Sequence, residues 1–136
     1  MASIFSRIIA GEIPCHKIAE NEDYLAFLDI NPRAEGHTLV IPKQEVDYIF
    51  DLEGATYAGL WAFSRKVATA LEKAVPCKRI GITVIGLEVP HAHVHLIPIN
   101  RVADINFERP PIQLSQDTFA AIAKRAAAAF EEAERK

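Results

Sequence analysis

Residues 80–99 read IGITVIGLEVPHAHVHLIPI, and this stretch decides the fold. Ile80–Ile85 and His91–Ile99 are strongly β-prone, and the short break Gly86–Pro90 separates them. We therefore expect them to be the last two strands of the domain. In the second strand, histidines alternate with apolar residues at positions 91, 93 and 95. Because alternate side chains of a strand point to the same face, three imidazoles should line one surface.

The rest of the chain predicts short strands around one long helix. Ser3 is placed to cap a short N-terminal helix that ends at Gly11. Apolar residues recur at helical intervals between Asp51 and Val75, with Asp51 as the expected N-cap, and residues 115–136 predict an alanine-rich C-terminal helix. The other expected strands are His16–Glu20, Tyr24–Asp29 and His37–Ile41. Together these elements predict an α+β fold, a single domain with a mainly antiparallel five-stranded sheet.

The composition limits the partners that the chain is expected to have. It contains 136 residues, of which 50% are hydrophobic, and its formal net charge is -3. A chain without a basic excess is not expected to bind a nucleic-acid polymer, and no apolar run is long enough to span a membrane. Cys15 and Cys77 are isolated, which favours reduced thiols. No secretion signal is recognisable, so we expect a cytoplasmic protein.

The three alternating histidines allow three chemical interpretations. In the first, a neutral imidazole attacks phosphorus while its neighbours orient it and donate to a phosphate oxygen. Gly86 lets the backbone of the preceding loop approach the anion. In the second, two of the histidines bind a metal ion with His37, because the ends of the triplet are about 13 Å apart and too distant for one zinc ion; Glu88 is the nearest carboxylate in sequence. In the third, the histidines form a solvated polar face. We favour the nucleophile.

The chain also resembles the histidine triad (HIT) family of nucleotide hydrolases and transferases, particularly its phosphoramidase branch. The segment Gly86–Ile97 looks like the family's motif of histidines alternating with hydrophobic residues. Ile4–Pro14 is similar to the family's opening helix, and Phe27–Pro32 and Gly36–Lys43 resemble its nucleoside-binding strand and the strand that follows. The resemblance covers about residues 3 to 99.

This resemblance implies a site and a reaction. His93 would attack the α-phosphorus of a nucleoside 5'-phosphoramidate or adenylate and form a nucleotidyl-histidine. His95 would contact the phosphate, His91 would support His93 through its main-chain carbonyl, and His37 would stand behind the triad. The nucleotide, expected to carry adenine, would contact a further set of residues: Phe5, Ile8, Phe27 and Ile30 around the base, Asp29 at the ribose, and Gly86 and Glu88 in the loop. Neither a cofactor nor a metal is implied, and a homodimer is expected.

The chain departs from the family pattern at several positions. Ser3 and Ser6 stand where many relatives have a zinc-binding cysteine pair, so that zinc site is expected to be absent. Leu87 and Glu88 replace residues that are often glutamine and serine, and we expect Glu88 to point outward or act as an acid. Two alternative functions stay open: hydrolysis of dinucleoside polyphosphates, and nucleotide binding as a sensor module with little catalysis.

Overall fold

The computed structural model describes residues 2–135, and within this range five strands form one antiparallel sheet in the order β1-β2-β3-β5-β4. The strands are β1 (Lys17–Glu20), β2 (Tyr24–Leu28), β3 (Thr38–Pro42), β4 (Arg79–Thr83) and β5 (Val94–Ile99). The helices are α1 (Ile4–Ile9), α2 (Gly54–Ala74) and α3 (Gln116–Glu134), with the short 3-10 helices η1 (Ile49–Asp51) and η2 (Val102–Ile105). The predicted α+β fold with an antiparallel five-stranded sheet is confirmed.

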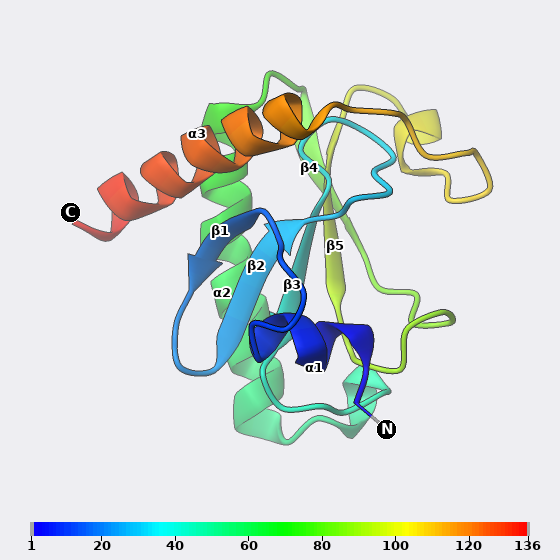
Figure 1. Cartoon of the computed structure of the whole chain (residues 1–136), viewed down its shortest axis with the longest axis vertical. Helices are drawn as coiled ribbons and strands as arrows, with labels where there is room; N and C mark the ends of the chain where they lie inside the picture. The colour runs from blue at the N-terminus through cyan, green and yellow to red at the C-terminus, as the bar shows by residue number, and fades with distance from the viewer. Residues whose placement is uncertain (1, 136) are drawn as a thin grey trace.

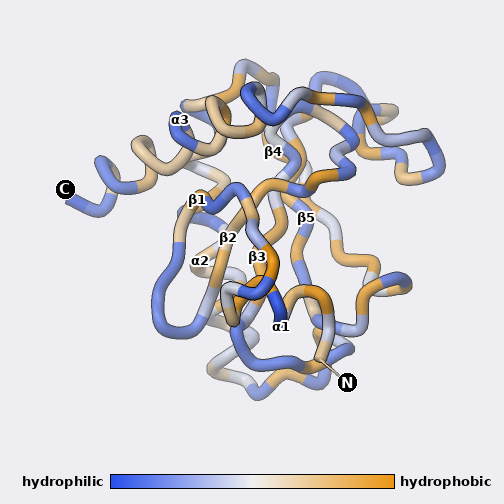
Figure 2. Tube along the Cα trace, in the orientation of Figure 1, coloured by the Kyte–Doolittle hydropathy of each residue, from blue (hydrophilic) through white to orange (hydrophobic). Residues whose placement is uncertain are grey.

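The two faces of the sheet are covered differently, as Figure 1 shows. On one face, Val40 of β3 and Leu96 of β5 belong to a large core that also contains Leu60 and Val67 of α2 and Ile122 of α3. On the other face, residues at the alternate positions of the strands form a smaller apolar cluster with the helix α1: Phe5, Leu25, Phe27, Leu39 and Ile41. Figure 2 shows that the strands are largely hydrophobic and that polar segments lie mostly in the outer loops and turns.

The ends of several elements differ from the prediction. The strand predicted over His91–Ile99 begins only at Val94, so two of the three histidines precede it. The prediction that Asp51 caps the central helix is wrong, because Asp51 lies in η1 and α2 begins at Gly54. The strand predicted to reach Ile85 ends at Thr83. These differences arise because hydrogen-bonded pairing, which β-propensity does not reveal, decides where a strand ends.

A helix lies near each end of the described residues, α1 at one end and α3 at the other. Ser3 accepts a hydrogen bond from the Ser6 N–H and caps α1 as predicted, and Ser115 accepts one from the Thr118 N–H at the start of α3. The last residue of the predicted C-terminal helix, Lys136, lies outside the described residues. Among the helices of residues 2–135, none has the length and apolar character needed to cross a bilayer.

Candidate functional site

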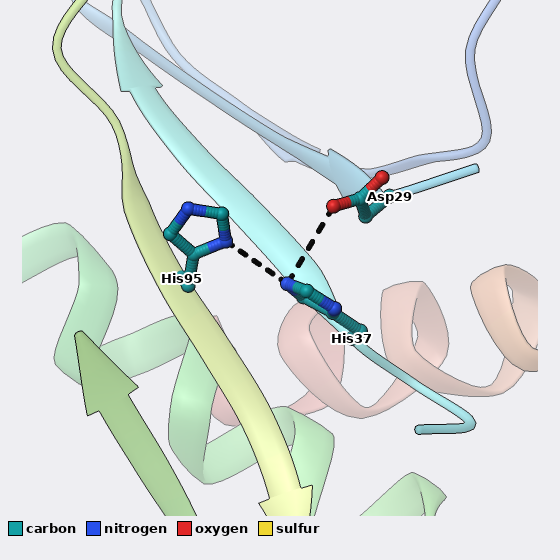
Figure 3. A group of neighbouring side chains, drawn as sticks. All are labelled: Asp29, His37 and His95. Carbon is teal, nitrogen blue, oxygen red and sulfur yellow. Dashed lines mark hydrogen bonds and ion pairs between the residues drawn. The ribbon is translucent and has the colours of Figure 1, made fainter. Parts of the chain in front are cut away.

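Asp29, His37 and His95 lie in or next to three neighbouring strands and meet on the same side of the sheet (Figure 3). Asp29 follows β2 and has the same parity as Phe27, while His37 precedes β3 and has the same parity as Leu39. His95 lies within β5, opposite Leu39 in the sheet register. Because side chains alternate across a strand, all three polar groups fall on the face of the smaller apolar cluster.

His37 has a defined proton position. Its Nδ1 accepts a hydrogen bond of 2.9 Å from the backbone N–H of Arg33, so the proton of the neutral ring is on Nε2. This Nε2 lies 3.0 Å from His95 Nδ1 and 3.6 Å from Asp29 Oδ2. The shorter contact makes His95 Nδ1 the acceptor. The proton of a neutral His95 ring is therefore on its Nε2, which faces away from His37 in Figure 3.

His93 and His91 are also fixed by acceptors that cannot donate. His93 Nδ1 lies 2.7 Å from the carbonyl oxygen of His91, so Nδ1 carries the proton and Nε2 keeps its lone pair. His91 donates from Nε2 to the Pro42 carbonyl oxygen at 2.8 Å, and its Nδ1 accepts from the Ser3 hydroxyl at 2.9 Å. The rings of His93 and His95 are adjacent, with their centroids 4.8 Å apart. A ring with a free lone pair thus lies beside a ring with a free N–H.

The electrostatics of the site favour neutral imidazoles. Burial lowers the pKa of all four histidines, and it lowers the pKa of His37 and of His95 to about 3. For His93, the bond to the His91 carbonyl opposes this shift by raising the pKa. A neutral ring near pH 7 is the form that a histidine nucleophile requires, because protonation would occupy the lone pair of Nε2.

The cluster of Asp29, His37 and His95 also has the composition of a metal site, since one ligand atom from each residue lies within 4.8 Å of the others. It differs from the predicted metal site, which combined His37 with two triad histidines and named Glu88 as the nearest carboxylate. Metal binding through His37 Nε2 would move the ring proton to Nδ1, where the Arg33 N–H already points at a distance of 2.9 Å. Two N–H groups would then face each other, so the hydrogen bonds favour proton donation by His37 over metal ligation.

Three of the four residues predicted to surround the base lie together. The rings of Phe5 and Phe27 meet edge to face with centroids 5.7 Å apart, Phe5 lies 5.0 Å from the His93 ring, and Ile8 packs against the same cluster. Ile30 differs, because 65% of its surface is exposed and it lies outside the cluster. The structure thus places an apolar cluster directly beside the candidate nucleophile.

Asp29 follows β2 two positions after Phe27 of this cluster. Its side chain is 18% exposed, and Oδ1 accepts a hydrogen bond of 2.8 Å from the Asn31 N–H. Burial raises the pKa of Asp29, while the bond from Asn31 and the charge of Arg33 lower it. A half-buried carboxylate beside apolar rings is suited to accept hydrogen bonds from a ligand that carries hydroxyl groups.

The loop before the triad is open to solvent. Gly86 has a φ of +75°, a conformation that favours glycine, and no atom lies within 4 Å of the position a Cβ would occupy. Glu88 is exposed, as expected for a carboxylate that points outward. Its negative charge adds to the raised pKa of Asp29 and partly opposes the lowering of the pKa of His93 by burial. A cavity of about 590 Å³ adjoins His93, and its lining also includes Phe50, Trp61, Gly86 and Leu87. Ligand groups can therefore reach His93 from this side.

Two residues that sequence reasoning missed also contact the histidines. The Phe107 ring packs edge-on against His95, with centroids 4.7 Å apart, and the Arg33 guanidinium lies 4.9 Å from the centre of the Phe107 ring. The positive charge of Arg33 contributes to the lowered pKa of His37 and of His95. Phe107 lies in an irregular segment with no periodic pattern, so no sequence signal pointed to it. Arg33 was hidden in the breaker-rich stretch at residues 31–36.

Comparison with known proteins identifies a family and related structures. A family model described as the HIT domain matches residues 10–102. The adenosine 5'-monophosphoramidase of Schizosaccharomyces pombe is 38% identical over 100 residues, which cover 72% of this chain and 74% of that protein. An uncharacterized HIT-like protein of Helicobacter pylori is 39% identical over 102 residues, covering 70% and 94%. The crystal structure of a Hit-like protein from Bartonella henselae has a TM-score of 0.83 and 32% sequence identity, covering 93% of this chain and 95% of that one.

Proposed function

The chain belongs to the HIT domain family, and we propose that it hydrolyses or transfers nucleotides at the α-phosphorus of nucleoside 5'-phosphoramidates or related adenylates. The observation that carries this proposal is a pair of contacts, 2.7 Å from His93 Nδ1 to the His91 carbonyl and 3.0 Å from His95 Nδ1 to His37 Nε2, which set the tautomers of His93 and His95. His93 keeps a lone pair on Nε2 because its Nδ1 donates to the His91 carbonyl. His95 keeps an N–H on Nε2 because its Nδ1 accepts from His37. A nucleophile and a hydrogen-bond donor are thereby adjacent.

In the proposed reaction, the lone pair of His93 Nε2 forms a bond to phosphorus while the bond from phosphorus to the leaving amine breaks. The amine departs with the electron pair of that bond and takes up a proton from solvent. The His93 ring then bears a positive charge, which strengthens the hydrogen bond from Nδ1–H to the His91 carbonyl. Water next attacks phosphorus and releases one proton to solvent, which balances the proton taken up by the amine, and the bond to Nε2 breaks to regenerate the neutral ring. The nucleoside monophosphate is released.

The neighbouring residues have proposed roles in the same step. The Nε2–H of His95 donates to a phosphate oxygen whose negative charge grows in the transition state. His37 holds His95 in this tautomer through the 3.0 Å contact. The base, which we propose is adenine, lies between the apolar side chains of Phe5, Ile8 and Phe27. Asp29 accepts the ribose hydroxyls, and the backbone at Gly86 approaches the phosphate.

A fluorogenic adenosine phosphoramidate tests the proposal. The wild-type protein should turn over this substrate, and His93→Ala should abolish turnover. Rapid quench followed by mass spectrometry should trap the wild-type protein as a nucleotidyl-histidine. His16→Gln provides a matched control, because His16 stacks on Phe119 of α3 rather than on any triad ring. Its turnover should stay close to that of the wild type.

Two outcomes would point to the alternatives. Turnover of a diadenosine polyphosphate with a higher kcat/KM than the phosphoramidate would make the protein a dinucleoside polyphosphate hydrolase on the same scaffold. Tight binding of AMP without any trapped adduct would make it a nucleotide-binding module and overturn the proposed chemistry. Equal turnover by the wild type and His93→Ala would exclude His93 as the nucleophile.

The proposal includes a homodimer formed by a second copy of the chain at β4. This strand pairs only with β5 in the sheet order and is therefore an edge. The edge is apolar, with Ile82 48% exposed and Leu87, in the loop that follows, 88% exposed. Light scattering should give twice the chain mass, and Ile82→Lys should give a monomer. A wild-type mass equal to that of one chain would overturn the dimer.

A further inference from the structure

The segment that carries the candidate nucleophile is not held by strand pairing. His91, Ala92 and His93 precede β5, whose ladder with β3 begins at Val94. Side-chain and loop contacts replace the ladder here: Ala92 N–H donates to the Val46 carbonyl at 2.7 Å, and the two nitrogens of His91 bond to Pro42 and Ser3. The position of His93 therefore depends on contacts that strand pairing does not supply.

Ser3 belongs to a network that ends on Glu45. A single carboxylate oxygen, Oε1 of Glu45, accepts from the Ser3 backbone N–H at 2.7 Å and from the Ser6 hydroxyl at 2.6 Å. The Ser3 hydroxyl oxygen accepts from the Ser6 backbone N–H at 3.0 Å. These bonds lower the pKa of Glu45 to about 2, the Ser6 hydroxyl contributing most, so the carboxylate is ionised and can only accept.

His91 needs a donor at its Nδ1. The ring donates from Nε2 to the Pro42 carbonyl, so Nδ1 keeps a lone pair. The Ser3 hydroxyl, which also has Glu45 within reach as an acceptor, lies 2.9 Å from His91 Nδ1 and is closer to it than the Ser6 hydroxyl at 3.5 Å. Accepting there keeps the His91 proton on Nε2, where it bonds to Pro42. Hydrogen bonds thus connect Glu45 through Ser3 to His91, whose carbonyl accepts a hydrogen bond from His93 Nδ1.

The same bonds hold the first helix against the site. Helix α1 has six residues, too few to be stable by itself, so its position depends on tertiary contacts. It carries Phe5, whose ring lies 5.0 Å from the His93 ring and 5.8 Å from the His91 ring. Glu45 bonds to Ser3 and Ser6 at the start of α1. Loss of its carboxylate would therefore weaken both the packing of the Phe5 ring on His93 and the hydrogen bond from Ser3 that supports His91.

We propose that Glu45, acting through Ser3 and Ser6, is a positioning residue that orients His91 and thereby holds His93 in its nucleophilic tautomer. For catalysis, this inference rests on the function proposed above. Glu45 is exposed and far in sequence from both the triad and α1. A merely solvated surface carboxylate would not place one oxygen on two donors of the same helix turn.

The geometry predicts different behaviour for two substitutions of Glu45. Glu45→Gln keeps an oxygen that can accept both bonds, whereas Glu45→Ala removes the acceptor. We expect Glu45→Ala to lower kcat about tenfold with little change in KM, the effect of about one hydrogen bond in the transition state. Glu45→Gln should stay within about twofold of the wild type by the same reasoning. Ser3→Ala should resemble Glu45→Ala.

Ring tautomers give a readout that does not need turnover. In long-range ¹H–¹⁵N spectra, wild-type His93 should show a protonated Nδ1 and an unprotonated Nε2, and Glu45→Ala should show a mixture of tautomers at His93 or His91. Ser115→Ala is the matched control for loss of a helix cap, because Ser115 caps α3 through the Thr118 N–H just as Ser3 caps α1 through Ser6. It should lower the melting temperature without altering the histidine spectra.

Three outcomes would overturn the inference. The first is a lower melting temperature of Glu45→Ala with unchanged kcat and ring tautomers, which would give Glu45 a structural role alone. The second is a loss of kcat in Glu45→Gln as large as in Glu45→Ala, which would make the charge rather than the positioning responsible. The third is a wild-type His93 with its proton on Nε2. If the wild type turns over no substrate, the spectra still test the network, so failure of the proposed function remains distinguishable.

Discussion

Lowering the pH from 7 to 5 should destabilise the folded protein by about 4 kcal/mol, through His37 and His95 alone. Both rings are buried beside one another, and burial lowers the pKa of each to about 3. In the unfolded chain the pKa of a histidine is about 6.5. At a pH between these two pKa values, each ring is protonated in the unfolded state and neutral in the folded state.

The sign and size follow from this difference in bound protons. Stability is fully present above about pH 6.5 and is lost as the pH falls towards 3, at about 1.4 kcal/mol per pH unit for each ring. From pH 6.5 to 5 each ring thus costs about 2 kcal/mol, whatever the exact folded pKa, provided that it lies well below 5. His91 and His93, whose pKa values are also lowered by burial, add to the loss. A total of about 4 kcal/mol is a large part of the stability of a typical domain, about 5–15 kcal/mol.

Urea denaturation at pH 7, 6 and 5 and constant ionic strength measures this loss. His37→Gln removes one of the two titrating rings, so the loss between pH 7 and 5 should shrink by about 2 kcal/mol relative to the wild type. A wild-type loss below about 1 kcal/mol would refute the reasoning, because it would mean that these rings accept protons in the folded state. If His37→Gln loses as much free energy of unfolding between pH 7 and 5 as the wild type, His37 does not contribute to the pH dependence.

Three further predictions concern activity and stability. The acid limb of the kcat/KM profile should lie below pH 6.5, because burial lowers the pKa of His93, and an inflection above that value would contradict a buried neutral nucleophile. Gly36→Ala should destabilise the protein by about 1–3 kcal/mol, because Gly36 has a φ of +89° and a Cβ there would lie 2.9 Å from Val75 Cγ2. Gly54→Ala is the matched control, because nothing lies within 4 Å of the position that a Cβ would occupy at Gly54. Equal melting temperatures of Gly36→Ala and Gly54→Ala would contradict the prediction. Phe107→Leu should cost about 1–2 kcal/mol in urea denaturation, since it removes the ring contacts with His95 and with the guanidinium beneath it; no loss would show that the ring contributes little.

The sequence predicted most of the elements because their patterns are periodic. Helical spacing between Asp51 and Val75 indicated α2, and two-residue alternation placed Leu25 and Phe27 on one face, as the packing of β2 confirms. The alternation of the histidines likewise predicted their common face. These signals succeed because burial of one face imposes the same repeat on the sequence and on the structure.

The sequence did not reveal contacts between segments that are far apart in the chain. Phe107 reaches His95 from an irregular loop, and Glu45 reaches Ser3 across 42 positions. Nothing in local spacing encodes such meetings, because they depend on how the sheet and loops fold back on themselves. The proton positions of the rings are equally non-local, since each is set by an acceptor or donor from a different segment.

The late start of β5 at Val94 has a chemical consequence. Within a ladder, a backbone carbonyl points sideways at the neighbouring strand and receives an N–H there. His91 precedes the ladder, so its carbonyl can turn towards the ring of His93 and accept the Nδ1 proton at 2.7 Å. Had the strand begun at His91, as its β-prone sequence predicts, the His91 carbonyl would point towards the neighbouring strand. It would then not accept from His93 Nδ1, and nothing would keep the proton off His93 Nε2. Because the ladder begins only at Val94, a main-chain oxygen can select the reactive tautomer. For the same reason, the Ser3 side chain at the N-cap of α1 and the Pro42 carbonyl at the end of β3 are needed to hold the segment in place.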